Sequence, residues 1–554
     1  MESSKKEKKN ITKKRKRENK DKMDMDDNEI KNNEEEEYES VSSSSEDEVY
    51  EEVEESFEEE EEKNNNNNNT ITSSANNNNN NNNNNKVLVN IWDEKNKNNL
   101  KVNEELDFDN NAYEMLHRSK VEWPCLSIDF LIPENFSNKN IKNFYLKNSE
   151  RKFTMDKYPY TTYMIAGSQT NEKINYLYYM KWYNMYKTKY DDDPEKALDS
   201  DDEEASNPFM KFEKYKIKGN INRVKTMKNS FITAIYTDLP SVEIIDLSEL
   251  IKNLENEKDN ESIENEDNNF FSKTNNKKNK KDNKNIIVKS FPQKFEGFAL
   301  DWNNINPFIL ASGGYENKIN IFIPKDENCS DMLEYDLYSN KNNKFHKYMH
   351  SNSIEDIQWS PNQENVLCSC SIDKSIKFWD IKSDNIPIII PDAHDSDINC
   401  ISWNKLRPNL IASGGDDCIF KVWYIRFIKD GPITNIKWHK GPINSIMWDP
   451  NDDSQLAVTS EDDRLSIWDF SVEPDDKKMF DNFNNEIPQQ LVFLHQGQNN
   501  LKEVKFHPYF KDMLVSTSEN GINLFKPGFN EDVNDDDLND EGDGNERENE
   551  MEIE

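Results

Sequence analysis

The sequence has no long hydrophobic run and few cysteines. No apolar stretch in its 554 residues approaches the roughly 20 residues that a membrane-spanning helix needs, and residues 1–10 lack the apolar centre of a secretory signal. Its six cysteines indicate neither a disulfide framework nor a zinc module. The motifs GxxxxGKS/T, HExxH and GxSxG are also missing, and Cys368 with Cys370 forms only a CxC. We therefore expect an intracellular, non-enzymatic protein with no membrane span, cofactor or metal.

Negative charge is concentrated in three segments. The chain has a net charge of −38 and 34% hydrophobic residues, which permits one or two folded domains plus disordered chain. Residues 34–62 carry 17 acidic and no basic residues, 191–206 carry nine and one, and 531–554 carry 13 and one, together −37. Such blocks repel themselves, so we expect them to be disordered. They indicate either solubility alone or electrostatic attraction of a highly basic partner, and they disfavour direct binding of nucleic acid.

The N-terminal segment carries the opposite charge. Residues 1–20 contain ten Lys or Arg and three Glu. The densest run is Lys13, Lys14, Arg15, Lys16 and Arg17. We predict a basic disordered import-signal segment over residues 1–33, with RNA contact as the alternative. Residues 34–85 and 530–554 are predicted to be disordered tails, the first of them also rich in Asn.

Three sequence units repeat without a gap. Each begins with a His, has Asp 23 residues later and has Trp six residues after the Asp, with a period of 44 and then 45. The three sets are His350, Asp373 and Trp379; His394, Asp417 and Trp423; and His439, Asp462 and Trp468. This period matches the four-stranded blade of a β-propeller. Because three copies share one spacing, we interpret the histidines as members of structural hydrogen-bond networks rather than as catalytic groups.

Four weaker copies extend the array. They lie within residues 161–182, 219–247, 295–324 and 495–527, so the sequence predicts an all-β, seven-bladed propeller over residues 136–529. Closing the ring would remove exposed sheet edges. Disordered inserts 191–206 and 252–285 are predicted to separate blades one and two and blades two and three. A third, 472–490, is predicted between blades six and seven, and loops on such a ring commonly bind partners.

Residues 86–135 precede the predicted ring. Asp109–Arg118 reads as a short helix with Asp109 as N-cap and with Tyr113 and Leu116 on one face. Leu126, Ile128 and Phe130 alternate as in a strand, which we expect to become the outer strand of the last blade and so close the ring. The helix would either pack on the rim or also form part of a partner groove.

The segment AYEMLHRSKVEWPCLSIDF (112–130) resembles the N-terminal segment of two related families. These are the WD-repeat histone-binding chromatin-assembly proteins and the glutamate-rich WD-repeat ribosome-assembly proteins. EWP followed by a Leu is typical of the first family. Four further segments resemble the second: Pro124–Ser127, Ile221–Val224, Glu296–Trp302 and Pro488–Pro508. The resemblance covers about residues 100–527 and implies a WD40 propeller.

The resemblance also implies a function and a location. The glutamate-rich family acts in the nucleus and nucleolus, in large-subunit ribosome biogenesis, as a chaperone-like binder of a basic ribosomal protein, and it binds histones. We therefore expect a monomeric, non-enzymatic scaffold that binds such a protein or pre-ribosomal particles. The alternative is a histone H4-binding subunit of chromatin-assembly or chromatin-modifying complexes.

A partner groove is implied by the chromatin-assembly relatives. In these proteins a basic histone helix lies between the N-terminal helix and an acidic loop before the last blade. The corresponding residues here are Tyr113, Met115, Leu116, Glu473, Asp475 and Asp476. Lys477 and Lys478 interrupt the acidic loop.

Overall fold

The computed structural model describes most of the chain from residue 108 onward. The described residues are 86–88, 108–131, 158–171, 174–189, 208–256, 286–325, 331–337, 345–383, 386–473, 478–480 and 486–528. The predicted import signal, the tails over residues 34–85 and 530–554 and the insert 191–206 lie outside them.

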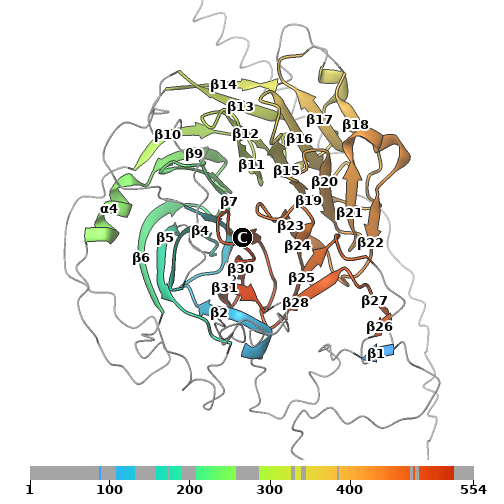
Figure 1. Ribbon diagram of the computed structural model, residues 1–554. Helices are drawn as coiled ribbons and strands as arrows, with labels where there is room; N and C mark the ends of the chain where they lie inside the picture. Colours follow the sequence, from blue (N-terminus) through green and yellow to red (C-terminus); the bar gives the residue numbers. More distant parts are fainter. Residues whose placement is uncertain are drawn as a thin grey trace, which may run out of the picture. The chain divides into compact units, whose positions relative to one another are not determined.

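Seven four-stranded antiparallel sheets surround one centre as the blades of a propeller (Figure 1). The predicted seven-bladed architecture is therefore confirmed. Blade 1 contains β3 (Cys125–Phe130), β4 (Tyr160–Ser168), β5 (Ile174–Met185) and β6 (Phe209–Lys218). Blade 2 contains β7 (Ile221–Thr226), β8 (Ile232–Thr237), β9 (Ser241–Asp246) and β10 (Ile287–Pro292). Blade 3 contains β11 (Ala299–Trp302), β12 (Leu310–Gly313), β13 (Ile319–Pro324) and β14 (Met332–Asp336).

The remaining blades follow the same order from the inner to the outer strand. Blade 4 contains β15 (Ile354–Trp359), β16 (Val366–Ser371), β17 (Ile376–Asp380) and β18 (Ile388–Ile390). Blade 5 contains β19 (Ile398–Trp403), β20 (Leu410–Gly415), β21 (Phe420–Tyr424) and β22 (Thr434–Ile436). Blade 6 contains β23 (Ile443–Trp448), β24 (Gln455–Ser460), β25 (Arg464–Asp469) and β28 (Leu491–His495). Blade 7 contains β29 (Val504–Phe506), β30 (Leu514–Ser518), β31 (Gly521–Pro527) and, as its outer strand, β2 (Tyr113–Ser119).

The predicted helix over Asp109–Arg118 is wrong. Asp109 caps only a 3-10 turn, η3 (Asn110–Ala112), by accepting a 3.0 Å hydrogen bond from the Asn111 N–H. The chain then continues as β2, which pairs antiparallel with β31. Both faces of β2 are covered and only Arg118 is exposed, so its apolar residues do not alternate as they do in a half-buried strand. Pairing with the open edge of β31 outweighs the local preference for a helical turn.

The ring is closed by a strand from the N-terminal side, but not by the predicted one. Leu126, Ile128 and Phe130 lie in β3, the inner strand of blade 1, and the closing strand is β2. Its free edge is also covered. The segment after β5 runs beside it, where the Thr188 N–H donates to the Glu114 carbonyl (3.0 Å) and the Leu116 N–H donates to Thr188 Oγ1 (2.9 Å).

The three insertions lie inside blades, so the prediction that they separate blades is wrong. Residues 191–206 lie between β5 and β6, 257–285 between α4 (Ser248–Asn256) and β10, and 472–490 between β25 and β28. Each is the connection from a third strand to an outer strand. The outer strands escaped recognition because they are the least buried; in β6 only Ile217 is buried. The insert predicted from residue 252 also begins inside α4, whose Ile251 and Leu254 pack into the apolar core of blades 1 and 2.

Short elements decorate the rim. The 472–490 insertion contains β26 (Lys478–Phe480) and β27 (Glu486–Ile487), and β26 pairs in parallel with β1 (Lys86–Leu88). Two further 3-10 helices are η5 (Phe345–Tyr348) and η6 (Ile425–Asp430). Within the described ranges, no helix has the length and apolar character needed to cross a membrane.

The alternating strand directions give the ring two distinct faces. We call the first the histidine face: it carries the connections between blades and those from second to third strands, including His350 and Asp373. We call the second the insert face: it carries the connections from first to second and from third to outer strands. All three insertions and the end of β31 at Pro527 therefore lie on the insert face.

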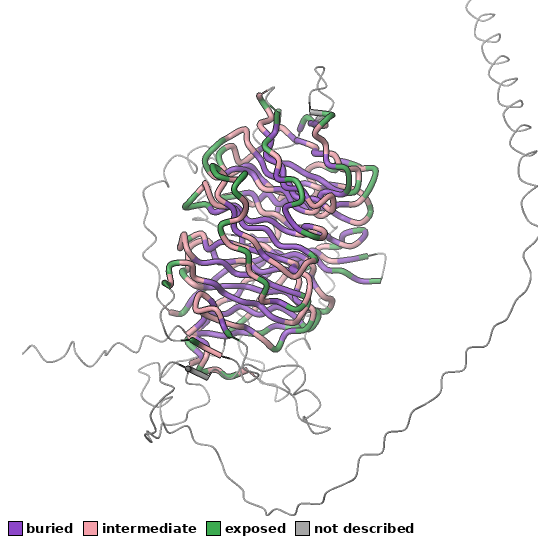
Figure 2. Tube along the Cα trace, turned by 90° about the vertical axis from the view of Figure 1, so that its right-hand side faces the viewer, coloured by how far each residue is buried: buried purple, intermediate pink, exposed green. Residues whose placement is uncertain are grey.

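Apolar side chains fill the spaces between neighbouring blades. Figure 2 shows the buried residues running through the whole ring, with exposed residues at the connections. Second-strand glycines allow close contact between blades: a Cβ at Gly414 would lie 2.5 Å from the side chain of Ile443 in the next blade. Gly167 faces Ile221 and Gly313 faces Ile354 in the same way. The repeat therefore fixes the distance between blades as well as the fold of each blade.

Candidate functional site

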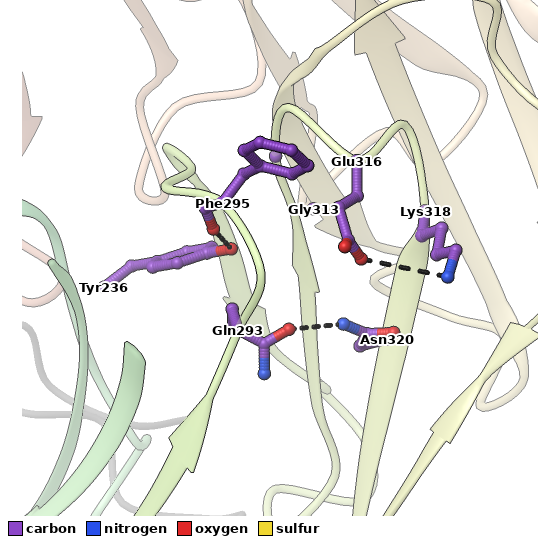
Figure 3. Close-up of a pocket in the computed structure, with 8 residues that line it drawn as sticks. Tyr236, Gln293, Phe295, Gly313, Glu316, Lys318 and Asn320 are labelled. Atoms are coloured by element: carbon purple, nitrogen blue, oxygen red, sulfur yellow. Dashed lines mark hydrogen bonds and ion pairs between the residues drawn. The ribbon is translucent and has the colours of Figure 1, made fainter. Parts of the chain in front are cut away.

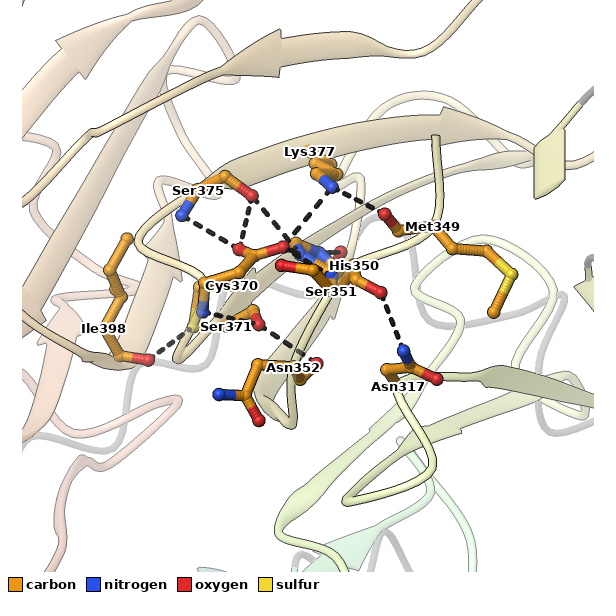
Figure 4. A network of polar contacts seen from close by, with 12 residues as sticks. Asn317, Met349, His350, Ser351, Asn352, Cys370, Ser371, Ser375, Lys377 and Ile398 are labelled. Carbon is orange, nitrogen blue, oxygen red and sulfur yellow. Dashed lines mark hydrogen bonds and ion pairs between the residues drawn. The ribbon is translucent and has the colours of Figure 1, made fainter. Parts of the chain in front are cut away.

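A buried hydrogen-bond network joins the repeat residues of blade 4 (Figure 4). His350 Nδ1 lies 2.9 Å from Asp373 Oδ2, and His350 Nε2 lies 2.7 Å from Ser369 Oγ. Trp379 Nε1 donates to the same Ser369 oxygen (2.9 Å). The serine hydroxyl is therefore free to donate to Nε2 while Nδ1–H donates to the carboxylate, an arrangement that suits a neutral imidazole. Burial alone would raise the pKa of Asp373, but the hydrogen bond with His350 holds it well below its usual range.

The other two clear repeats form the same network with one substitution. In blade 5, His394 Nδ1 lies 2.9 Å from Asp417 Oδ2, and its Nε2 lies 2.7 Å from Ser413 Oγ, which also accepts from Trp423 Nε1. In blade 6, His439 Nδ1 lies 3.1 Å from Asp462. There the serine comes from the third strand.

Blade 6 moves this serine across the sheet. Val458 occupies the second-strand position held by Ser369 and Ser413 in the other blades. Its cross-strand partner is Ser466, whose hydroxyl lies 2.8 Å from His439 Nε2 and accepts from Trp468 Nε1 at 2.7 Å. The hydroxyl reaches the same two ring nitrogens from the neighbouring strand, so all nine repeat residues take part in structural networks.

At the ring closure, His495 joins blade 6 to both outer strands of blade 7. Its Nδ1 lies 2.6 Å from the Tyr113 hydroxyl, and its Nε2 accepts from Asn523 Nδ2 (3.2 Å). Its ring stacks on Phe525, with centroids 4.4 Å apart. Tyr113 is 4% exposed and Met115 is fully buried, so these residues and Leu116 pack inside the closing blade. The structure therefore gives them no helix face along a partner groove.

The acidic half of the predicted groove is described only in part. Glu473 is exposed at the start of the 472–490 insertion. Asp475 and Asp476 lie outside the described residues. The structure thus does not bring the six predicted groove residues together, and it places three of them in the core.

A polar network that the sequence did not reveal crosses the centre of the ring. Glu503, which is 1% exposed, accepts from Ser127 Oγ (2.7 Å) and the Ile128 N–H (2.8 Å) in blade 1. It also pairs with Arg223 of blade 2 (3.0 Å) and with Lys505 (2.8 Å). Although burial alone would raise it, these two cations hold the pKa of Glu503 at about 2.

Arg223 extends this network to a third neighbour. Its Nε donates to the Phe298 carbonyl at the entrance to blade 3 (2.8 Å), while its Nη1 contacts Glu503. One guanidinium therefore ties blades 2, 3 and 7. The Ile221-Asn222-Arg223-Val224 sequence was part of the resemblance, but only the fold shows that its Arg meets a Glu 280 residues away.

A small hollow opens on the histidine face between blades 2 and 3 (Figure 3). The Tyr236 hydroxyl donates to the Phe295 carbonyl (3.2 Å), and Asn320 Nδ2 donates to Gln293 Oε1 (2.7 Å) beside Glu316. Large apolar side chains are exposed around it, namely Leu239, Phe295 and Tyr315. Burial raises the pKa of Tyr236, and Glu316 and Glu296 raise it further. We call this area the blade 2–3 patch; it combines apolar contact area with negative charge.

No metal-binding chemistry was found in the described part of the chain, where no three His, Cys, Asp or Glu residues are grouped to hold an ion. The buried thiols do not form a nucleophile site either, since burial raises the pKa of Cys368 and Cys370. The arrangement is therefore suited to holding other proteins on a rigid ring.

Comparison with known proteins agrees with this architecture. The family model for the histone-binding protein RBBP4 and its counterpart in the CAF1 complex matches residues 103–186, and the "WD domain, G-beta repeat" model matches 343–380, 386–424 and 431–469. Ribosome assembly protein rrb1 of Schizosaccharomyces pombe is 30% identical, over 77% of this chain and 82% of that protein. Glutamate-rich WD repeat-containing protein 1 of Dictyostelium discoideum is 34% identical, over 77% and 83%. Protein HEAT STRESS TOLERANT DWD 1 of Arabidopsis thaliana is 31% identical, over 76% and 88%.

Proposed function

Because the chain belongs to the family of glutamate-rich WD-repeat and ribosome assembly proteins, we propose that it is a non-enzymatic chaperone for a highly basic protein during large-subunit ribosome assembly. The partner class is a basic ribosomal protein, alone or on pre-ribosomal particles, and the site of action is the nucleus and nucleolus. The import run Lys13–Arg17 fits this location.

The observation that carries the proposal is the separation of charge from fold. Three acidic segments carry −37 of the net −38, which leaves −1 for the remaining chain. Two of these segments, 191–206 and 531–554, join the ring on its insert face. Negative charge of this density accelerates encounter with a cationic partner and makes binding sensitive to salt.

The blade 2–3 patch is the proposed docking surface for a basic segment of the partner. Phe295 and Tyr315 offer aromatic faces, and Glu296 and Glu316 offer carboxylates to Lys or Arg side chains. Capture by the acidic segments would therefore be followed by docking on a rigid surface, and the second step would supply selectivity.

The test is pull-down of the tagged full chain from nuclear extract, with quantitative mass spectrometry at low and high salt. We expect basic large-subunit ribosomal proteins and pre-ribosomal factors, and we expect Glu296→Gln/Glu316→Gln to lower their recovery severalfold. The matched control is Glu364→Gln/Asp430→Asn, which removes the same charge from the insert face. Equal recovery with both variants would refute the docking surface. Absence of ribosomal proteins, with recovery of histone-modifying proteins instead, would refute the function.

Histone H4 binding is a second candidate, favoured by the histone-binding family model that matches residues 103–186. We infer that its acidic contact would be Glu473, Asp475 and Asp476, with Tyr113, Met115 and Leu116 acting indirectly by holding β2 in place. Charge reversal of the three acidic residues to Lys should abolish binding of an H4 helix peptide. Unchanged peptide binding would remove this candidate.

A further inference from the structure

Three lysines lie near the centre of the insert face. Lys225 is close to the end of the inner strand β7, Lys228 follows that strand, and Lys405 follows the inner strand β19 on blade 5. Inner strands end on the insert face, so the three side chains start from the central part of that face. Lys228 and Lys405 are exposed and Lys225 is half-buried. We call Lys225, Lys228 and Lys405 the lysine cluster.

The positive charge of the lysine cluster is not neutralised by the part of the chain that the structure describes. None of its three ammonium groups forms an ion pair or hydrogen bond with a described residue. The nearest carboxylates are engaged elsewhere: Asp129 accepts from the Thr226 N–H (2.7 Å), and Asp301 accepts from the Trp359 N–H (2.8 Å).

The three lysines also act on one another. Burial lowers the pKa of Lys405, and Lys228 and Lys225 lower it further, while Asp301 and Asp129 oppose this. Blades 2 and 5 are not neighbours, so this repulsion extends across the centre of the ring. A bound anion would relieve it, because attraction at this range is strong where water is partly excluded.

The acidic C-terminal segment begins on the same face. β31 ends there at Pro527, and the Gly528 N–H donates to the Ala112 carbonyl (2.9 Å). Residues 531–554 follow, with 13 acidic residues and one basic residue. The 26 residues from 529 to 554 can extend to roughly 90 Å, and a ring of about 400 residues has a radius of gyration of only about 21 Å. The segment therefore reaches the lysine cluster with length to spare.

We propose that residues 531–554 dock on the lysine cluster when no partner is bound. The other acidic segment on this face, 191–206, is a poorer occupant because both of its ends are tied to the rim strands β5 and β6, whereas 531–554 is joined to a described strand at one end only. A basic partner would then compete with the ring for this segment, so docking sets a threshold for capture; that consequence alone rests on the proposed function.

The test uses the full chain with a fluorophore at its C-terminus and measures segment mobility by time-resolved anisotropy. We expect Lys225→Gln/Lys228→Gln/Lys405→Gln to lower the ratio of docked to free segment about fivefold, as three modest surface ion pairs would. The matched control is Lys294→Gln/Lys440→Gln/Lys502→Gln, which removes the same charge from the histidine face. Equal mobility in all three chains, or an equal change in both variants, would overturn the proposal.

Carbodiimide cross-linking of the wild-type chain identifies the docked segment directly. We expect Lys228 and Lys405 to link to carboxylates within 531–554. Linkage to residues 34–62 or 191–206 instead would overturn the choice of segment. Inorganic polyphosphate should release the segment and raise its mobility, and failure to do so would contradict an anion site. No basic partner is present in these experiments, so their failure would leave the proposed function untouched.

Discussion

Three buried histidines at the ring closure make the fold sensitive to acid. His117 lies in β2, His495 stacks on Phe525, and His507 lies at the junction of blades 7 and 1, where its Nε2 is 3.1 Å from Thr162 Oγ1. Burial lowers their pKa values, to about 4 for His117, about 4 for His495 and about 3 for His507. In the unfolded chain each returns to about 6.5.

The magnitude follows from these pKa values. When the pH falls from 7 to 5, the unfolded chain takes up a proton at each histidine while the folded chain does not, so the free energy of unfolding decreases. pH 5 lies about 1.5 units below the unfolded pKa, and each unit is worth 1.36 kcal/mol, which gives about 2 kcal/mol per histidine. The three together would cost about 6 kcal/mol.

Two buried carboxyl groups oppose this loss. Burial raises the pKa of Asp449 to about 7 and that of Asp301 to about 6. Their folded forms take up protons before the unfolded chain does as the pH falls, so stability rises by about 2 kcal/mol for Asp449 and about 1 kcal/mol for Asp301. We therefore expect a net loss of about 3 kcal/mol between pH 7 and pH 5.

Urea unfolding followed by tryptophan fluorescence at both pH values measures this difference. His117→Leu removes one titrating group from a site where its Nε2 has no partner among the described residues, and it should reduce the net loss to about 1 kcal/mol. Asp449→Asn should enlarge it to about 5 kcal/mol. If His117→Leu and the wild type lose the same stability, or if stability rises at pH 5, buried neutral histidine is not the cause.

Two other predictions concern the networks. Ser466→Ala should cost about 1–2 kcal/mol in urea unfolding, because His439 and Trp468 lose their shared partner; adding Val458→Ser should recover most of it, and failure to recover would mean that the cross-strand position is not equivalent. Arg223→Leu should cost about 3–5 kcal/mol by leaving Glu503 without one of its two cations; a cost below about 1 kcal/mol would show that Lys505 alone satisfies Glu503.

The sequence predicted the fold because the repeat carries its own geometry. A fixed His to Asp to Trp spacing requires that the three residues meet in every blade, and the measured contacts in blades 4, 5 and 6 agree. The serine was less visible, because a cross-strand exchange changes its sequence position from 19 to 27 residues after the histidine while preserving its place in space.

The sequence was misleading where long-range contacts decide the structure. Tyr113–Ser119 satisfies a local helical pattern, and only the open edge of β31, some 400 residues later, makes a strand more stable. The Arg223–Glu503 pair spans 280 residues and has no local signature at all. Insert positions were misjudged for a different reason: outer strands are partly exposed, so they lack the apolar pattern that marks the inner strands.

The candidate site remained beyond the sequence because its parts lie on different blades. The blade 2–3 patch joins Tyr236 of β8 to the connections on either side of β11, and the lysine cluster joins blades 2 and 5. Charge counted along the chain gives these groups no special weight, since the chain outside the acidic segments carries a net −1.

A nearly neutral ring with acidic segments implies that capture and docking respond differently to salt. Screening acts over about 8 Å at physiological ionic strength, so the long-range attraction that the acidic segments exert weakens first. Contacts at the blade 2–3 patch include exposed apolar area at Leu239, Phe295 and Tyr315, which salt does not weaken. Rising salt should therefore slow association of a basic partner much more than it speeds dissociation. A parallel change in both rates would instead place all of the binding energy in the acidic segments and leave the ring as their carrier.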